Sequence, residues 1–161
     1  MFDMKFKTKT KKLKILFMKK LFITALFAVA ISVSSFANVT NVNLLVMNHF
    51  SADFRGAENV NWTVTSKFTK AVFEMEGKKM EAFYNTSGEF MGISTAIHYA
   101  KLPKKAIKNL AVQYPPAIYK LEECIEFTNA DEEKNYYVSF LTEKGKVIVQ
   151  INSFGNISFF K

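Results

Sequence analysis

Four consecutive segments in the middle of this chain alternate apolar and polar residues, and turn residues separate them. The segments cover residues 60–65, 71–76, 80–84 and 91–97. Alternation with a period of two is typical of a strand that buries one face. Residues 76–78 and 85–88 carry the glycine and asparagine expected in tight turns. The spacing therefore predicts an antiparallel meander with one buried face and one wet face.

Apolar residues at helical spacing occur both before this meander and after it. From Asn41 to Asp53 apolar residues recur every three or four positions, and Asn41 is the expected cap. Leu102-Pro103 predicts the start of a second helix, because proline is favoured at the first helical position. Pro115 is expected to end that helix. Three or four further strands are predicted at 118–127, 136–141, 147–151 and 157–160.

The order helix, strands, helix, strands predicts an α+β domain made of two helix-plus-antiparallel-meander repeats. Gly77 and Gly88 bracket one strand of the first half, and Gly145 and Gly155 bracket one strand of the second. We expect both helices to pack on one face of the sheet, because each has a single apolar stripe to bury.

The N-terminal part of the chain has the features of a secretory signal peptide. Two lysines at 19–20 precede an apolar run at 21–33, and Ser35-Phe36-Ala37 offers small residues where a signal peptidase needs them. We expect cleavage between Ala37 and Asn38. The run is shorter than the roughly 20 apolar residues of a membrane-spanning helix, so an uncleaved anchor is the weaker alternative.

These features divide the chain into residues 1–37, an N-terminal extension with the signal peptide, and residues 38–161, a single domain. Residues 18–37 form a complete signal peptide by themselves, so we expect Met18 rather than Met1 to be the true start. No cysteine follows the apolar run, which argues against a lipid anchor. The expected location is the periplasm or the extracellular space, with no stable membrane anchor after cleavage.

The charge of the whole chain comes mostly from this leader. The chain has 22 basic and 14 acidic residues, of which eight lysines and one aspartate lie in residues 1–37. The remaining 14 basic and 13 acidic residues give the domain a net charge of +1. A nucleic-acid-binding domain would carry a basic stripe. The lysines at 101–108 are interpreted as a solvated helix face, and we expect no nucleic-acid partner.

The sequence contains no recognisable catalytic or metal-binding motif. His49 and His98 are the two histidines, and neither has another ligand at metal-binding spacing. Phosphate-binding glycine loops and nucleophile elbows are absent from the sequence. We therefore expect a protein that is not an enzyme, with no catalytic residue, no cofactor and no metal.

The remaining reactive side chains have simple structural interpretations. Cys124 is alone, so it cannot form an intramolecular disulfide; it is expected to be a partly buried strand residue, with dimerisation through it as the alternative. Glu122 and Glu126 are expected to share one strand face and Glu123 to point the other way. Carboxylates on a sheet face are usually solvated.

An ordered set of apolar positions gives the chain a family resemblance. These positions are Phe54, Ala57, Val60, Trp62, Ala71, Phe73, Ala82, Tyr84, Gly88, Leu102, Pro103, Ile107 and Tyr114. The chain resembles the PepSY-like, β-lactamase-inhibitor-like domains of exported proteins of the Bacteroidetes type, from about residue 42 to residue 160. The resemblance implies a tandem helix-plus-sheet fold outside the cytoplasm. That family has no established catalytic residues, and a shared fold does not fix function.

Adjacent aromatic residues at 83–84, 136–137 and 159–160 must point to opposite faces of their strands. Some aromatic surface therefore lies outside a single core, which can mark an interface. The leading hypothesis is an exported, non-enzymatic binding or inhibitor-like module for another envelope or extracellular protein. The alternative is a carrier or sensor of a small apolar ligand. A third hypothesis is a hydrolase that uses His49, Glu122 or Glu126. The partner and the oligomeric state are left open.

Overall fold

The computed structural model describes residues 42–161. The predicted signal peptide, its cleavage site at Ala37 and Asn38, the start at Met18 and the predicted cap Asn41 lie outside these residues. All of these described residues belong to one compact unit. Among residues 42–161, no helix is long and apolar enough to cross a membrane.

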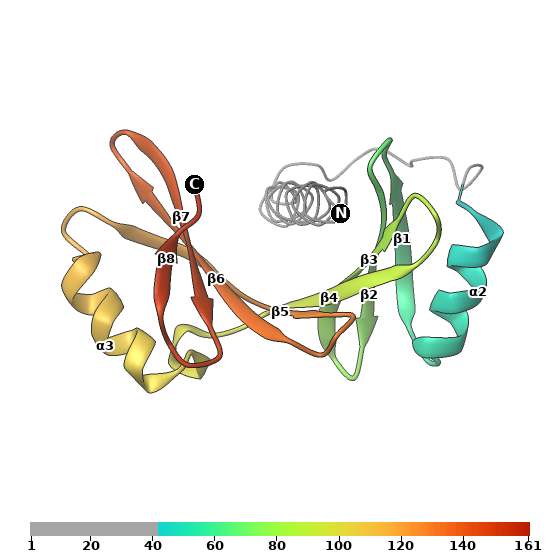
Figure 1. Ribbon diagram of the computed structural model, residues 1–161, viewed down its shortest axis with the longest axis horizontal. Coiled ribbons are helices and arrows are strands. Elements are labelled where there is room, and N and C mark those ends of the chain that lie inside the picture. Colours follow the sequence, from blue (N-terminus) through green and yellow to red (C-terminus); the bar gives the residue numbers. More distant parts are fainter. Residues whose placement is uncertain (1–41) are drawn as a thin grey trace, which may run out of the picture. The chain divides into compact units, whose positions relative to one another are not determined.

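Two α-helices, one 3₁₀ turn and eight strands make up the described unit (Figure 1). In chain order they are α2 (Leu44–Asp53), β1 (Glu58–Val64), β2 (Phe68–Met75), β3 (Lys78–Asn85), β4 (Phe90–Ala96), the 3₁₀ turn η3 (Tyr99–Lys101), α3 (Lys104–Gln113), β5 (Lys120–Asn129), β6 (Lys134–Thr142), β7 (Gly145–Asn152) and β8 (Ile157–Phe159). The strands form one open antiparallel sheet in the order β1 to β8. The predicted α+β class and the predicted strands are confirmed.

The ends of both helices follow from local chemistry. Asn43 caps α2, because its Oδ1 accepts a hydrogen bond of 2.9 Å from the N–H of Leu45. The observed cap is thus two residues beyond the predicted one. Pro103 occupies the cap position of α3 rather than its first turn. Tyr114 ends α3 by donating its N–H to the carbonyl of Leu110 at 2.8 Å.

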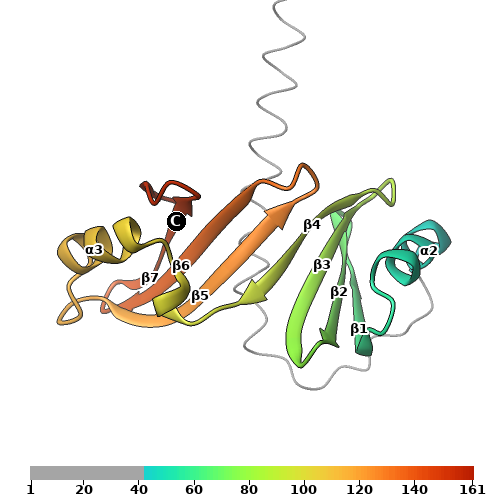
Figure 2. The same ribbon diagram turned by 90° about the horizontal axis from the view of Figure 1, so that it is seen from below.

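The strand register places both helices on the same face of the sheet, since opposite residues in antiparallel strands point to the same side. One row of successive partners lies under α2: Trp62, Ala71, Ala82, Ile93 and Thr128. A second row lies under α3: Cys124, Val138 and Val149. Cys124 and Thr128 are four residues apart on β5, so the two rows share one face. The helices lie toward opposite ends of the sheet (Figures 1 and 2).

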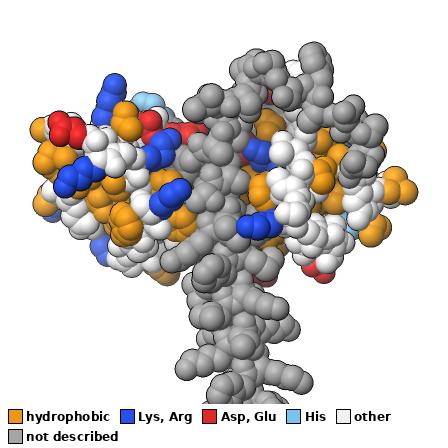
Figure 3. All heavy atoms as spheres, turned by 90° about the horizontal axis from the view of Figure 1, so that it is seen from above, with side chains coloured by type: hydrophobic (Ala, Val, Ile, Leu, Met, Phe, Trp, Pro, Cys, Tyr) orange, Lys and Arg blue, Asp and Glu red, His pale blue; other side chains and the backbone are white. Residues whose placement is uncertain are grey.

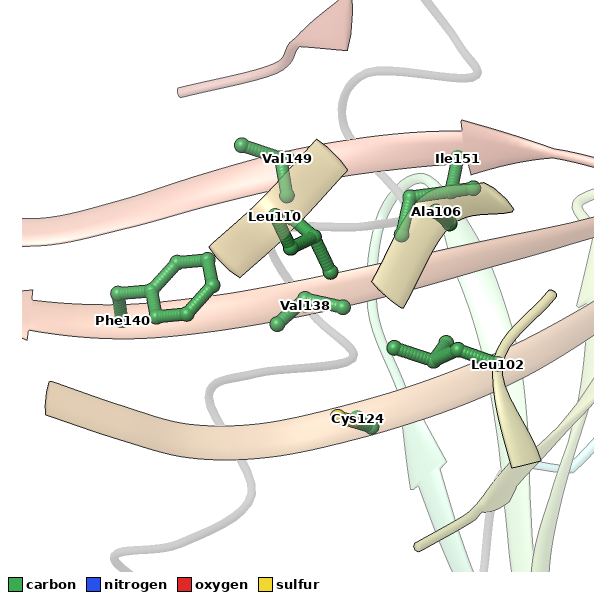
Figure 4. Close-up of a cluster of buried hydrophobic side chains, with 8 residues drawn as sticks. All are labelled: Leu102, Ala106, Leu110, Cys124, Val138, Phe140, Val149 and Ile151. Atoms are coloured by element: carbon green, nitrogen blue, oxygen red, sulfur yellow. The ribbon is translucent and has the colours of Figure 1, made fainter. Parts of the chain in front are cut away.

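Each helix closes its own hydrophobic core. Under α2 the core is aromatic: the ring of Phe50 lies 5.0 Å from those of Trp62 and Phe73, and Phe54 lies 5.0 Å from Phe73. Under α3 the core is mainly aliphatic (Figure 4), and its buried residues are Leu102, Ala106, Leu110, Cys124, Val138, Phe140, Val149 and Ile151. Burying one Leu, Ile or Phe side chain of this kind stabilises the fold by about 1.5–3 kcal/mol.

The residues that carry the family resemblance are largely residues of these two cores. Ala71, Phe73, Ala82 and Tyr84 are completely buried under α2. Leu102 is buried under α3, and Ile107 and Tyr114 pack against the same cluster. The family resemblance therefore rests mainly on the residues that form the two cores between the helices and the sheet.

Candidate interaction surface

The face of the sheet opposite to α2 and α3 is the best candidate for a functional surface, and we call it the helix-free face. No helix of residues 42–161 packs on it (Figures 1 and 2). The register assigns to it the side chains used below: Phe68, Lys70, Glu74, Lys79, Glu81, Phe83, Gly92, Glu123, Phe127, Tyr137, Lys146, Ile148 and Phe160.

Aromatic rings contact one another across this face. The ring of Phe83 on β3 lies 6.1 Å from Phe68 on β2 and 6.2 Å from Phe127 on β5. Phe127 reaches across β4 because Gly92 has no side chain: a β-carbon at residue 92 would lie 2.5 Å from Phe127 Cζ. At the other end of the sheet, Tyr137 contacts Phe160 with ring centroids 5.7 Å apart. Phe68, Phe127 and Phe160 are half-buried, so they are the rings of this face that can supply apolar contact area with little side-chain entropy to lose.

The adjacent aromatic pairs divide between the two faces as predicted. Phe83 belongs to the helix-free face, whereas Tyr84 is buried in the core under α2. Tyr137 contacts Phe160 on the helix-free face, whereas Tyr136 packs against the core under α3. Phe83 and Tyr137 therefore lie outside the two helical cores, as predicted, but both side chains are buried, at 1% and 3% exposed, and do not form open surface.

Charged groups of both signs lie between these rings. Lys70 Nζ and Glu81 Oε1 form an ion pair of 3.3 Å, and Glu81 Oε2 is buried without a hydrogen-bond partner among the described residues. Burial raises the pKa of Glu81, and the ammonium of Lys70 opposes this. Burial also raises the pKa of Glu123, and the negative charge of Glu81 adds to the effect. A face with both signs of charge selects a partner by geometry rather than by net charge.

The two histidines hold backbone in place. His49 Nδ1 lies 3.1 Å from the carbonyl oxygen of Gly88, which ties α2 to the turn between β3 and β4. His98 Nδ1 accepts a bond of 3.3 Å from the N–H of Ala100 and so caps η3. In residues 42–161, no group of three or more His, Cys, Asp or Glu side chains could hold a metal ion.

The expectation that Glu122 and Glu126 share one strand face is wrong. A register shift between Leu121 and Glu123 inserts an extra residue into β5 and breaks the alternation there. Glu122 pairs at 2.8 Å with Lys146, on the side of the helix-free face. Glu126 pairs at 2.8 Å with Lys134 on the helical side. The structure therefore does not bring these two carboxylates together.

Cys124 lies in the core under α3 and is 4% exposed (Figure 4). Burial, and then the charge of Glu123, raises the pKa of its thiol to about 11. Reactive cysteines are accessible and have a lowered pKa. The side chain thus has the properties of an inert core residue, and it is more deeply buried than the partly buried strand residue that the sequence predicts.

The space between α2 and the sheet is occupied by aromatic rings. Besides the contacts of Phe50, Phe54 lies 6.1 Å from Phe90, and Tyr84 lies 5.7 Å from Phe90. Rings at these separations are in ordinary packing contact. The geometry therefore gives no specific support to a ligand held between α2 and the sheet.

Apolar side chains also reach the surface of the described unit, interspersed with lysine and arginine (Figure 3). On α2, Leu44, Leu45 and Met47 are exposed; around β8, Phe154 and Phe159 are exposed. Phe159 belongs to the aromatic pair at 159–160 that is predicted to divide between the two faces. The spacing of the exposed residues of α2 is compatible with a buried role, and only the three-dimensional arrangement shows that they are on the outside.

Comparison with solved structures shows which class of fold this is. A BLIP-like protein from Bacteroides fragilis superposes with a TM-score of 0.61 at 11% identity, over 73% of this chain and 84% of that one. A DUF2874 family protein from Bacteroides uniformis gives a TM-score of 0.63 at 13% identity, over 73% and 86% of the two chains. The chain therefore has the fold of the BLIP-like and DUF2874 structures.

A third structure, that of a "putative periplasmic" protein from Bacteroides eggerthii, gives a TM-score of 0.64 at 10% identity. The match covers 74% of this chain and 89% of that one. A scan against family models finds no match, and no curated protein matches the chain in sequence. At these identities the likeness concerns the fold.

Proposed function

We propose that this protein is an exported, non-enzymatic binding module that recognises another envelope or extracellular protein through its helix-free face. The observation that carries the proposal is the placement of both helices on one side of a single open sheet. The other side is left with interacting aromatic rings between charged groups of both signs. Protein interfaces are rich in aromatic residues that provide rigid contact area.

An extracytoplasmic location is part of this proposal. It is supported by the signal-peptide pattern of residues 18–37 and by the similarity of the fold to that of the structure from Bacteroides eggerthii. A PepSY-like relationship is supported by the order of the core positions from Phe54 to Tyr114.

We further propose that the two halves of the sheet are repeats of one unit. Each half has a ten-residue helix that ends in an aromatic cap residue, Phe54 or Tyr114. Each cap ring packs on a phenylalanine of the sheet: Phe54 lies 5.0 Å from Phe73, and Tyr114 lies 5.2 Å from Phe140. The equivalent positions of the helices, cap residues and phenylalanines in the two halves support a duplication.

The last hairpin of each half also contacts the start of its helix. A β-carbon at Gly88 would lie 3.4 Å from Leu45 Cβ of α2, and one at Gly155 would lie 3.0 Å from Lys105 Cβ of α3. The glycine-containing turn therefore packs on the first helical turn in both halves. In a repeat, the two halves can present similar surfaces to one elongated partner.

Site-specific photo-cross-linking tests the proposed function. A photoreactive residue replaces Glu74, an exposed position on the helix-free face, or Val112, a 77% exposed position on α3 that serves as the matched control. The chain from residue 38 is incubated with the envelope fraction of its own host, and adducts are identified by mass spectrometry. We expect one protein to be linked from residue 74 and not from residue 112. No adduct, or equal adducts from both positions, would contradict the proposal.

A further inference from the structure

The sheet ends at β8, and this edge differs from the edge at β1. Both edge strands have backbone groups that no neighbouring strand of the sheet uses. Exposed edges can pair with another chain, and proteins usually block them with charges, bulges or proline. The two edges of this sheet differ in such blocking features.

The β1 edge is interrupted at its start. It begins with the charged residue Glu58, and its register shifts between Glu58 and Asn61. Asn61 Nδ2 also donates a hydrogen bond of 2.9 Å to the carbonyl of Asn59, which removes an acceptor from the edge. From Asn61 to Val64 the register of β1 with β2 is regular, so the interruption is confined to the start of the strand.

The β8 edge is regular over its three residues and is interrupted only after them, where Phe160 and Lys161 both donate to the Ile148 carbonyl. Ile157, Ser158 and Phe159 are uncharged, and their register with β7 is regular. Asn152 donates its N–H to the Asn156 carbonyl at 3.1 Å, and Phe160 donates to the Ile148 carbonyl at 2.9 Å. Because bonded positions alternate along an antiparallel strand, the N–H and C=O groups of Ile157 and Phe159 point away from the sheet.

An exposed aromatic residue lies on the same edge. The side chain of Phe159 is 71% exposed, although its neighbour in register, Val149, is completely buried. A large apolar side chain beside unpaired backbone groups is the combination that favours pairing with another strand.

We infer that the β8 edge is a self-association site at which a second copy of this chain adds its own β8 in antiparallel orientation. In this arrangement Ile157 of each copy faces Phe159 of the other copy, which gives two symmetric pairs. The two residues of each pair exchange two backbone hydrogen bonds. The paired segment carries no charge, so the two-fold symmetry creates no repulsion within it. Each Phe159 ring then covers Ile157 of the opposite copy on the helical side of the joined sheets.

The strand is short, so the dimer is weak and reversible. Three residues a side bury far less than the roughly 1,200 Å² of a stable interface. We expect a dissociation constant on the order of 100 µM for this edge alone. This inference concerns an edge and not the helix-free face, so it stands or falls separately from the proposed function.

Analytical ultracentrifugation of the chain from residue 38, up to about 1 mM, tests the inference. Residues 42–161 contain both cores, so removing the leader leaves every described contact in place. We expect a monomer–dimer equilibrium. Phe159→Pro removes one outward N–H and leaves the inward ladder intact, and it should weaken dimerisation at least tenfold. Phe159→Lys, which adds like charges across the two-fold axis, should do the same.

Phe154→Lys is the matched control, because Phe154 is 77% exposed but lies in the turn before β8. It should leave the dimer unchanged. Melting curves by circular dichroism confirm that each variant folds, and Phe159→Lys decides the matter if Phe159→Pro does not fold. A wild-type chain that is monomeric at about 1 mM, or a dimer that Phe159→Lys does not weaken more than Phe154→Lys, would overturn the inference.

Discussion

The ring of Phe127 on β5 lies over Gly92 on the neighbouring strand β4. A β-carbon at residue 92 would come within 2.5 Å of Phe127 Cζ and 2.6 Å of the Thr128 carbonyl oxygen. An aromatic ring over a strand glycine shields the backbone and fixes the ring in place. This relationship brings Phe127 toward Phe83, and so it holds the aromatic centre of the helix-free face together.

Gly92→Ala should therefore destabilise the protein. The added methyl group meets a backbone oxygen that cannot move aside without breaking the pairing of β4 with β5, so we expect a loss of about 1–3 kcal/mol or more. Urea denaturation followed by tryptophan fluorescence measures this. Gly56→Ala is the control, since it also has positive φ but has no atom within 4 Å of the new methyl group. An equal loss in both variants would show that backbone strain, and not the contact with β5, explains the glycine.

Tyr84→Phe should leave stability unchanged or raise it slightly. Tyr84 is completely buried and its hydroxyl has no hydrogen-bond partner among the described residues. Removing an unsatisfied buried polar group recovers its desolvation cost, within about 1 kcal/mol. Tyr84→Ala, in contrast, removes the ring itself and should cost about 3–5 kcal/mol. A clear loss of stability in Tyr84→Phe would mean that the hydroxyl has a partner.

The thiol of Cys124 should react slowly in the folded protein. Its pKa is raised from 9.0 to about 11. Because the thiolate is the reactive form, alkylation by iodoacetamide at pH 8 should be at least about 100-fold slower than in urea. Rapid labelling of the native protein would contradict the buried position.

The same shift determines how this group contributes to stability as the pH changes. The folded state keeps the Cys124 proton to higher pH than the unfolded chain does. Its contribution is therefore complete below pH 9.0 and is lost as the pH rises through about 11. Cys124→Ala should lack this part of the pH dependence in denaturation measured between pH 8 and pH 11.

His49→Ala should lower stability by about 0.5–1.5 kcal/mol, because it removes the bond to the Gly88 carbonyl that joins α2 to a turn of the sheet. Thermal unfolding by calorimetry measures the change. His98→Ala, which removes a cap from the short turn η3, is the comparison. If His49→Ala instead left stability unchanged and abolished a detectable hydrolysis, the hydrolase hypothesis would replace the structural role.

The hydrophobic period was sufficient to predict both helices and seven strands, because most of these elements bury one side, and it left the eighth strand, at residues 157–160, open. It could not locate the bulge between Leu121 and Glu123, since an extra strand residue changes the register without changing composition. For this reason the sequence assigned Glu122 to the wrong face. Nor could it identify the contact of Phe127 with Gly92 or the pairing of Lys70 with Glu81. Both of these contacts depend on which strands are neighbours in the sheet.

Lysine footprinting of the complex with the captured partner tests the central claim most directly. Lys79 and Lys146 lie on the helix-free face, and Lys104 and Lys108 lie on α3; all four residues are exposed. Acetylation of the free and the bound protein is compared residue by residue by mass spectrometry. Binding through the helix-free face predicts strong protection of Lys79 and Lys146 and unchanged labelling of Lys104 and Lys108. Protection of the α3 lysines with free labelling of Lys79 and Lys146 would contradict it.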